Sequence, residues 1–304
     1  MSPETAPFHE LAHRGALILS GDDHRAFLQG LVSADIRTVT ENHSAWTALL
    51  TPQGKFLHDF FIYQLGNTLL LEGERERLED LRTRLLRYRL RAKVILESAP
   101  DLAVFGTLPP FHGPLKNLSH AGDTITFGDG IACMDPRLPA GGIRIVASRQ
   151  AISETGLTTT DMTEAAWEQN RIRNGLPDGS RDIEPEKGFL LEYGFDELGG
   201  VDFRKGCYVG QETTARMKWK HLTKKRLVPL RGEGKTIPQS NSPITLPDGQ
   251  VVGAIRSSTT DETGTGFLAM GIVRLDAIQA DDLRCDTMRL KPCPPAWLRL
   301  PDNR

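Results

Sequence analysis

Short apolar segments separated by turns rich in glycine and proline mark the first third of the chain and predict antiparallel strands. These segments cover residues 15–20, 45–50, 55–65 and 69–72. The turn Thr51-Pro52-Gln53-Gly54, between the second and third segments, is typical of a hairpin. Because successive side chains in a strand point to opposite faces, His58 and Asp59 are predicted to face opposite sides of the sheet.

Helical spacing of apolar residues predicts helices between these strands. One helix follows Asp22 or Asp23 and carries Phe27 and Leu28, and others cover residues 74–88 and 163–174. Further strands are predicted at residues 89–96, 102–105, 125–127 and 143–147. Strands interleaved with helices and joined by short turns indicate an α+β fold, with helices packed on one side of the sheets.

From residue 227 onward the pattern consists of short strands bounded by turn signals. They cover residues 228–230, 243–246, 251–257 and 266–273. Asp248-Gly249 between two of these strands is a good hairpin signal. Regular short strands favour a small barrel or sandwich, so a domain boundary is predicted near residues 223–226.

Composition is that of an ordinary soluble protein. The 304 residues are 39% hydrophobic and 25% charged, and this length predicts two or three domains. The net charge of −2 gives no reason to expect nucleic acid. No apolar run approaches the length of a membrane span, so no membrane contact is expected.

Cysteine usage and the first residues bear on the compartment. Cys133, Cys207, Cys285 and Cys293 form no C-x-x-C pair, which indicates neither a zinc site nor a disulfide framework. Met1 to Ala16 resembles neither a secretory signal nor an arginine-rich presequence. These features predict a cytoplasmic protein with reduced thiols.

Standard catalytic motifs are missing from the sequence. It contains no Walker-type phosphate loop, no G-x-G-x-x-G opening a βα unit and no H-E-x-x-H. Nucleotide-driven, nicotinamide-driven and zinc-protease chemistry are therefore not expected.

The segment Lys205-Gly206-Cys207-Tyr208-Val209-Gly210-Gln211-Glu212 is the strongest candidate for a site. Its two glycines suit a sharp turn that a ligand can approach closely. The ammonium of Lys205 beside Cys207 hints at a reactive thiolate, whereas the simpler interpretation is a tight turn with a buried, inert thiol. Pockets favour domain junctions, and the segment lies just ahead of the predicted boundary, which supports the first interpretation.

Charged residues elsewhere give weaker signals. Asp59, between Leu57 and Phe61 on its face, is expected to be partly desolvated and so suited to proton transfer, unless it is an ordinary edge residue. Asp135 with Arg137, and Arg89 with Arg91, are expected to form structural ion pairs. A basic run suits either an anionic ligand or a solvated face; it comprises Lys218, Lys220, His221, Lys224, Lys225 and Arg226.

The Lys205 to Glu212 segment resembles the K-G-C-Y-x-G-Q-E signature of the YgfZ family, the folate-binding relatives of the glycine-cleavage T-protein. The match is complete over the motif. Other segments agree in order along nearly the whole chain: 14–36, 52–55, 88–94, 135–137, and Arg171-Ile172 followed by Gly175 and Pro177.

This resemblance implies a three-domain T-protein-like ring, with α+β N-terminal domains and a C-terminal antiparallel β-barrel. The predicted domains are a folate-binding region over 1–222 and the barrel over 223–304. The first region is expected to interleave 1–50 and 115–222 as one domain with 51–114 as another. The resemblance also implies a monomer.

The same resemblance assigns the site residues. Cys207, Lys205 and Asp59 are the predicted catalytic residues. The predicted ligands of tetrahydrofolate, or another reduced folate, are Gly206, Tyr208, Gly210, Gln211, Glu212, Arg216 and Glu192, and no metal is expected. Two departures stand out: His58 replaces the first of a T-protein aspartate pair, and Gly194 lies where relatives often have an asparagine.

Three functions remain open on the sequence. The first is a folate-binding accessory protein that assembles or repairs iron–sulfur clusters, with client enzymes or assembly proteins as partners. Because clusters ordinarily take four thiolates, Cys207 alone is not expected to store one. The second is a folate-dependent aminomethyl- or methyltransferase, and the third is a binding module with an inert thiol. Whether any turnover occurs is left open.

Overall fold

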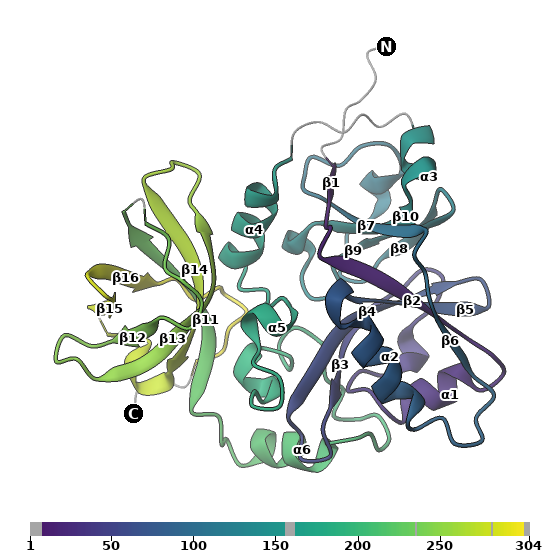
Figure 1. Cartoon of the computed structure of the whole chain (residues 1–304), viewed down its shortest axis with the longest axis horizontal. Helices are drawn as coiled ribbons and strands as arrows, with labels where there is room; N and C mark the ends of the chain where they lie inside the picture. The colour runs from purple at the N-terminus through teal and green to yellow at the C-terminus, as the bar shows by residue number, and fades with distance from the viewer. Residues whose placement is uncertain (1–7, 156–161, 235, 281, 301–304) are drawn as a thin grey trace.

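Two antiparallel sheets and a closed barrel make up the computed structural model, which describes residues 8–155, 162–234, 236–280 and 282–300 (Figure 1). The first seven residues, part of the stretch searched for a leader, lie outside the described residues. The architecture confirms the predicted α+β fold with a C-terminal antiparallel barrel. Among the described helices, none has both the length and the apolar character needed to cross a bilayer.

The first sheet has the strand order β3-β4-β5-β2-β6, and two helices cover one of its faces. His58 faces α2 and contacts Asp80, whereas Asp59 faces the opposite side and contacts Trp46, which confirms their predicted separation. The strands are β2 (Arg14–Ser20), β3 (Ala45–Leu50), β4 (Phe56–Leu65), β5 (Thr68–Glu74) and β6 (Ile95–Ser98), and the helices are α1 (His24–Gln29) and α2 (Leu78–Leu86).

The second sheet has the order β1-β7-β10-β9-β8 and packs against the first over a shared apolar core. That core includes Trp46 and Phe61 from the first sheet and Val104 and Val146 from the second. The strands are β1 (Phe8–Glu10), β7 (Leu102–Thr107), β8 (Thr124–Phe127), β9 (Gly130–Met134) and β10 (Ile143–Ser148), and α3 (Arg149–Glu154) follows the last of them.

The predicted strand over 89–96 is wrong apart from its last residues. Leu90 has a positive φ of 43° and is 90% exposed, so a turn follows α2 and the strand begins only at Ile95. Arg89 and Arg91 are exposed, and neither has an ion-pair partner among the described residues. The expected Arg89 and Arg91 pairs are therefore absent from this part of the chain, because both guanidinium groups are free to remain in water.

The barrel, on the left in Figure 1, has the closed order β11-β14-β13-β12-β15-β16. The turn at Asp248-Gly249 joins β12 to β13 with φ +85° at Gly249, as the hairpin signal predicts. The strands are β11 (Lys225–Glu233), β12 (Pro243–Thr245), β13 (Val251–Thr260), β14 (Gly266–Arg274), β15 (Leu283–Cys285) and β16 (Met288–Pro292).

A mostly helical segment lies between the sheets and the barrel (Figure 1). Helix α4 packs on β13 and β14, and α5 contacts both β4 and β13. The segment comprises α4 (Glu164–Arg173), α5 (Gly179–Asp182), the 3-10 turn η5 (Leu190–Tyr193) and α6 (Gln211–Trp219). It therefore bridges the two halves of the molecule.

The division of residues 1–222 into interleaved domains stays a prediction, and strand pairing groups the chain differently. Strands β3 and β4 lie on either side of residue 50 yet form one hairpin, and β2 pairs with β5. All five strands of the first sheet lie between residues 14 and 98. Apart from β1, which lies at residues 8–10 and joins the second sheet, the pairing therefore places the division between the sheets close to residue 100.

Glu72 joins the two sheets through buried charge. Its carboxylate accepts hydrogen bonds from Arg14 at 3.0 Å, Arg144 at 3.0 Å and the Tyr63 hydroxyl at 2.6 Å. Burial alone would raise the pKa of Glu72, but the guanidinium groups of Arg144 and Arg14 outweigh it and hold the pKa at about 2. Because Arg144 comes from β10 and the others come from the first sheet, this cluster fixes how the sheets meet.

Asp182 makes a similar connection to the barrel. Its carboxylate pairs with Arg171 of α4 at 2.5 Å and accepts from Ser257 of β13 at 2.6 Å. Arg171 in turn donates to Ser257 at 2.8 Å and pairs with Glu168 at 2.9 Å. The middle segment and the barrel are thus held together by fully paired buried groups.

Replacement of Glu72 by glutamine is expected to destabilise the protein by about 3 kcal/mol, because two buried guanidinium groups lose their counter-charge. The contribution of Glu72 is complete above its unfolded pKa near 4.5 and is lost as the pH falls towards 2. Urea unfolding of Glu72→Gln and wild type at neutral and acidic pH measures both effects.

Glu79→Gln is the matched control, since Glu79 is 69% exposed in a surface pair with Arg82 and should change stability by less than about 0.5 kcal/mol. Equal losses of stability in the two variants would show that the buried cluster stabilises the protein no more than a surface ion pair does.

Candidate functional site

A glycine-on-glycine contact shapes the turn that precedes α6. Gly210 has φ +81°, and a Cβ there would lie 2.6 Å from the Thr51 carbonyl oxygen and 2.9 Å from the Cα of Gly54. Gly54 itself has φ +78° and packs against Thr213. The predicted sharp turn is confirmed, and its partner is the hairpin turn that ends β3.

The segment from Phe203 to Gly210 runs back along α6. Phe203 packs edge-on against Trp219 at the end of the helix, with ring centroids 6.2 Å apart. Tyr208 lies close to Thr214, near the middle of the helix. Phe203 and Tyr208 thus lie against α6, the helix at the bottom of Figure 1.

Cys207 is exposed at this turn. An ideal Cβ built on its neighbour Gly206 would meet nothing within 4 Å, so the backbone beside the thiol is open to an approaching group. Cys133 and Cys285 are buried instead, and burial raises the pKa of the Cys133 thiol to about 12. The interpretation of Cys207 as a buried core thiol is therefore wrong.

Lys205 anchors the turn rather than facing the thiol. Its side chain is buried, and its ammonium donates to the carbonyl oxygens of Gln29 at 2.8 Å, Val32 at 2.5 Å and Ala34 at 2.7 Å. Burial lowers the pKa of Lys205 to about 8. All three N–H donors are directed at carbonyl groups, so this geometry gives no support to a catalytic role for Lys205.

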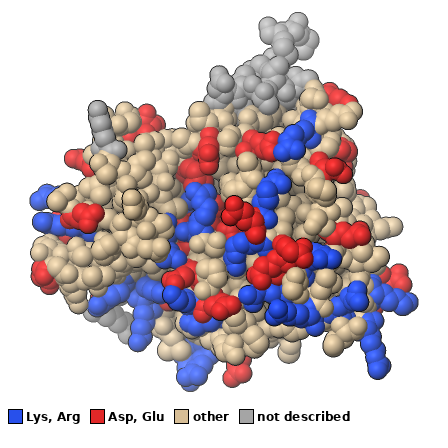
Figure 2. Space-filling model, viewed as in Figure 1, with Lys and Arg blue, Asp and Glu red and all other residues tan. Residues whose placement is uncertain are grey.

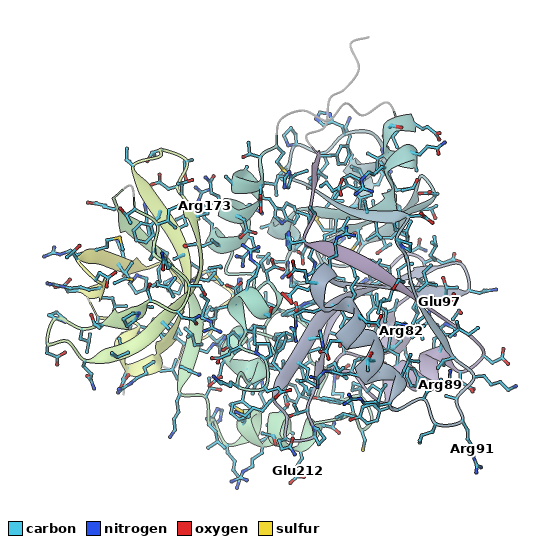
Figure 3. The ribbon with its side chains drawn as sticks, in the orientation of Figure 1. Arg82, Arg89, Arg91, Glu97, Arg173 and Glu212 are labelled. Carbon is cyan, nitrogen blue, oxygen red and sulfur yellow. The ribbon has the colours of Figure 1, made fainter. Side chains whose placement is uncertain are left out.

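The remaining predicted residues of the motif differ in how far they are exposed. Tyr208 is buried, and its hydroxyl has no good hydrogen-bond partner among the described residues; burial raises its pKa to about 12. Gln211 is half-buried at the start of α6. Glu212 and Arg216 are exposed on the helix, and Figure 3 shows Glu212 at the lower edge of the molecule.

Asp59 is buried on β4, the second strand of its sheet, where it pairs with Ala48 of β3. Its Oδ2 accepts a hydrogen bond from Trp46 Nε1 at 2.9 Å, and the Trp46 ring stacks on Phe195 with centroids 3.8 Å apart. Burial raises the pKa of Asp59 to about 6, although Arg14 and Trp46 oppose the change. The expected desolvation of Asp59 is confirmed, and its interpretation as an edge residue is wrong.

Glu192 is the centre of a second group of polar residues, carried by η5. Its Oε2 accepts from the Phe189 backbone N–H at 3.2 Å and lies 3.8 Å from the ammonium of Lys225. Burial raises the pKa of Glu192. The Lys55 ammonium lies 3.2 Å from the centre of the Phe189 ring. The site thus combines a desolvated carboxylate, an aromatic ring and two cations.

Trp46, Lys55, Phe189 and Phe195 belong to these groups, but sequence reasoning did not assign them a site role. Lys55 ends the Pro52-Gln53-Gly54-Lys55 segment, which was the only available signal. The other three are aromatic residues whose patterns resemble those of core positions. Because Phe195 lies three residues after Glu192, the 189–195 segment connects the Asp59 and Glu192 groups.

The glycine at position 194 has a packing reason. It has φ +78°, and a Cβ would lie 2.8 Å from the Trp297 ring. Trp297 also donates to the Asn174 carbonyl oxygen at 2.8 Å. Where relatives often carry an asparagine, this chain accommodates an indole from the segment that follows the barrel.

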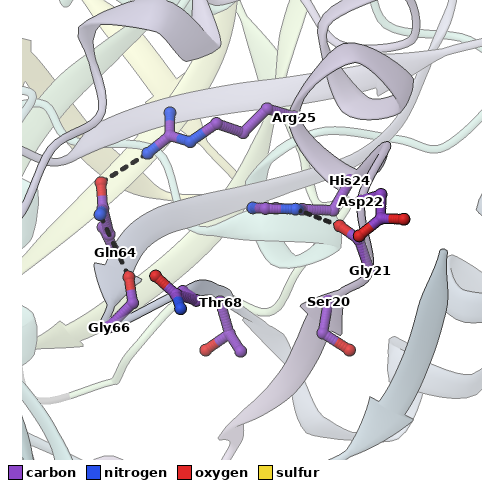
Figure 4. Close-up of a pocket in the computed structure, with 9 residues that line it drawn as sticks. Ser20, Gly21, Asp22, His24, Arg25, Gln64, Gly66 and Thr68 are labelled. Atoms are coloured by element: carbon purple, nitrogen blue, oxygen red, sulfur yellow. Dashed lines mark hydrogen bonds between the residues drawn. The ribbon is translucent and has the colours of Figure 1, made fainter. Parts of the chain in front are cut away.

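Two surface cavities differ in their relation to the motif. One of about 470 Å³ is lined by Ser20, Gly21, Arg25 and Gln64, and Arg25 is bonded there to Gln64 (Figure 4). It contains none of the predicted site residues. The other, of about 720 Å³, lies where α6 and η5 meet the barrel and is lined by Leu191, Asp196, Glu197, Met217, Lys218, His221, Thr223, Arg226, Leu275, Arg299 and Leu300.

A solved structure with the same fold is the glycine cleavage system aminomethyltransferase T from Bartonella henselae. It matches with a TM-score of 0.77 and 14% identity, over 97% of this chain and 87% of that one. The chain therefore has the aminomethyltransferase fold, as the sequence predicts.

Comparison of sequences identifies relatives of this chain. Residues 224–300 match the family model described as CAF17, C-terminal beta-barrel domain. A protein named iron-sulfur cluster assembly factor IBA57 homolog, mitochondrial, from Neurospora crassa is 33% identical over 72% of this chain and 52% of its own length. Its namesake from Aspergillus oryzae is 28% identical over 90% and 71%. The chain thus spans about half to seven-tenths of the length of these relatives.

The expectation of a cytoplasmic location is contradicted by these relatives. Those from Neurospora crassa, Aspergillus oryzae and Coccidioides immitis are all named as mitochondrial proteins. The expectation rested on residue composition at the start of this chain. The names describe the whole relatives, and this chain covers only part of their length.

Replacement of Lys205 by methionine is expected to destabilise the protein by about 2 kcal/mol, because three buried carbonyl groups lose a charged donor. Urea unfolding measures the loss, and the rate at which Cys207 reacts with a thiol reagent should rise as the turn loosens. Lys220→Met, on an exposed lysine, is the control and should leave both unchanged. A stable Lys205→Met variant with an unchanged thiol rate would refute the anchoring role.

Proposed function

We propose that this protein is a YgfZ-type, folate-binding accessory protein that assembles or repairs iron–sulfur clusters in client enzymes. The observation that carries the proposal is the exposed Cys207 thiol, held on a turn whose neighbouring lysine is buried and fully bonded. The names of the relatives support the same role. A monomer, with cluster-assembly proteins or clients as partners, fits this proposal.

Cys207 is proposed to bind iron for a short time while a cluster passes between proteins. A thiolate is a normal cluster ligand, and a single one leaves the other ligands to come from a partner. Within the described residues there is no group of three or more histidine, cysteine, aspartate or glutamate side chains arranged to hold a metal. Cys207 is therefore assigned to exchange, with the cluster as cargo.

Glu192 and its neighbours fit a reduced folate. A desolvated carboxylate can accept paired N–H groups from a pterin ring, Phe189 offers an aromatic face, and Lys55 and Lys225 suit the acidic tail. A bound tetrahydrofolate would supply a one-carbon carrier or an oxidisable pterin that can donate electrons. Tyr208, Gln211, Glu212, Arg216, Gly206 and Gly210 belong to the turn and α6, where they are proposed to shape the entrance.

Folate-dependent aminomethyl or methyl transfer is a second candidate. Its support is the aminomethyltransferase fold and the raised pKa of Asp59, about 6, which suits a group that exchanges protons near neutral pH. Asp59 is buried, however, and its Oδ2 already accepts a hydrogen bond from Trp46. We therefore rank transfer behind the accessory role.

Cys207→Ser is expected to fold normally and to bind tetrahydrofolate as the wild type does, because the thiol is exposed and serine keeps a side chain of similar size. In cells lacking the native protein, it should fail to restore the activity of iron–sulfur enzymes. Cys293→Ser, on the other exposed cysteine, is the control and should restore it. Full restoration by Cys207→Ser would mean that the thiol has no functional role. Measurable aminomethyl transfer by the purified protein would instead favour the second candidate.

Glu192→Gln is expected to weaken tetrahydrofolate binding about 10- to 100-fold, since a charged acceptor is replaced by an amide that presents a donor to the pterin. Isothermal titration calorimetry measures the change. Glu79→Gln, on an exposed carboxylate of α2, should bind within about twofold of wild type. A larger loss for Glu212→Gln than for Glu192→Gln would move the folate site to the turn.

A further inference from the structure

Apolar surface is exposed where α6 connects to the barrel. Trp219 is 70% exposed and Leu222 is 41% exposed, only three residues apart. The Trp219 ring is held against Phe203. Single exposed apolar side chains are ordinary on a soluble protein, whereas a supported aromatic ring with a second apolar neighbour is typical of a contact surface.

The cavity of about 720 Å³ adjoins this surface. Leu191 of η5, Met217 of α6 and Leu275 and Leu300 beside the barrel give it an apolar lining. Lys218 links it to the aromatic pair, because Lys218 lines the cavity, pairs with Asp196 there and has its ammonium 5.4 Å from the centre of the Phe203 ring. The cavity and the exposed rings are therefore parts of one surface.

The charge on this surface is positive. The acidic residues of the cavity are already paired, Asp196 with Lys218 and Glu197 with Arg226 at 2.7 Å. By contrast, four basic side chains have no acidic partner in the part of the chain that the structure describes: Lys220, His221, Lys224 and Arg299. Figure 2 shows lysine and arginine gathered along the same lower edge of the molecule. An occupant that neutralises this excess must be acidic.

We propose that Trp219, Leu222 and this cavity form a docking surface for an acidic segment of a protein partner. A bulky apolar side chain of the segment enters the cavity, its flanking carboxylates meet Lys220, His221, Lys224 and Arg299, and Trp219 packs over the segment. Phe203 lies four residues before Cys207, so the surface that holds the partner and the thiol are carried by the same segment of the chain. The identity of the partner, as the protein that exchanges a cluster at Cys207, rests on the proposed function; the docking itself does not.

The test uses the whole chain and a fluorescein-labelled peptide in which glutamates alternate with leucine and phenylalanine. A second peptide carries lysine in place of each glutamate. Fluorescence anisotropy should show binding of the acidic peptide only, and binding should weaken as salt rises. Trp219→Ala and the double substitution Lys220→Glu with Lys224→Glu should each weaken it at least about tenfold, because they remove the apolar anchor and the charge.

The matched controls lie far from this surface. Leu90→Ala removes an apolar side chain that is 90% exposed, and Arg91→Glu reverses a charge at the opposite lower corner of Figure 3. Both should bind the acidic peptide as the wild type does.

Several results would overturn the docking surface. These are equal binding of the two peptides, no binding of either, an unchanged affinity in Trp219→Ala, or tighter binding of vesicles containing phosphatidylserine than of the peptide. Cys207→Ser should bind the peptide normally. If the cellular assay of Cys207→Ser is also normal, the proposed function fails while the docking surface stands. If the acidic peptide does not bind but the cellular assay shows that Cys207 is required, the docking surface is refuted and the proposed function stands.

Discussion

The burial of one carboxylate, Glu72, constrains much of this molecule. A charged group removed from water must be paired on every side, and Glu72 finds its partners in Arg14, Arg144 and Tyr63. Arg14 also reaches Asp178, which belongs to the middle segment, at 3.2 Å. Asp182, four residues later, carries the connection on to Ser257 of the barrel. Two sheets, a helical segment and a barrel are thus joined through a chain of satisfied buried charges, and a shift of any one part would leave a charge unpaired.

The candidate site depends on this rigidity because its residues come from distant parts of the chain. The turn at Cys207 is tied to the end of α1 and the residues after it by the Lys205 ammonium, and to the turn between β3 and β4 by the contact between Gly210 and Gly54. The 189–195 segment reaches Trp46, the partner of Asp59, through Phe195, and it holds Glu192 beside Phe189 and Lys55. A thiol displayed on a firmly anchored turn can meet a partner in one orientation, which suits exchange of a cargo better than enclosure of it. The aminomethyltransferase fold is here combined with a surface cysteine that the transfer reaction does not require.

Sequence patterns predicted the secondary structure where local spacing decides it. The hairpin around Pro52, the opposite directions of His58 and Asp59, helix α4 and the first four strands of the barrel follow from periodicity and turn residues. The last two barrel strands, β15 and β16, were not predicted. The strand predicted over residues 89–96 is mostly wrong. The mixture of apolar and basic residues there resembles a strand, but the chain makes a turn and the Leu90 side chain is exposed to solvent. The cellular location was also predicted wrongly, because residue composition near the start of this chain carries little information about the compartment of its longer relatives.

By itself, the sequence determined most of the α+β elements, the change to short strands near residue 227, and a sharp glycine turn carrying a cysteine, because each depends on neighbouring residues. The tertiary structure decided what those residues contact. Lys205 looked like a partner for Cys207, yet its three acceptors lie more than 170 residues away in sequence. Gly194 is explained by Trp297, and Asp59 by Trp46 and Phe195. Burial and hydrogen-bond partners arise from contacts between distant segments, so only the folded chain shows which thiol is open and which charges are already paired.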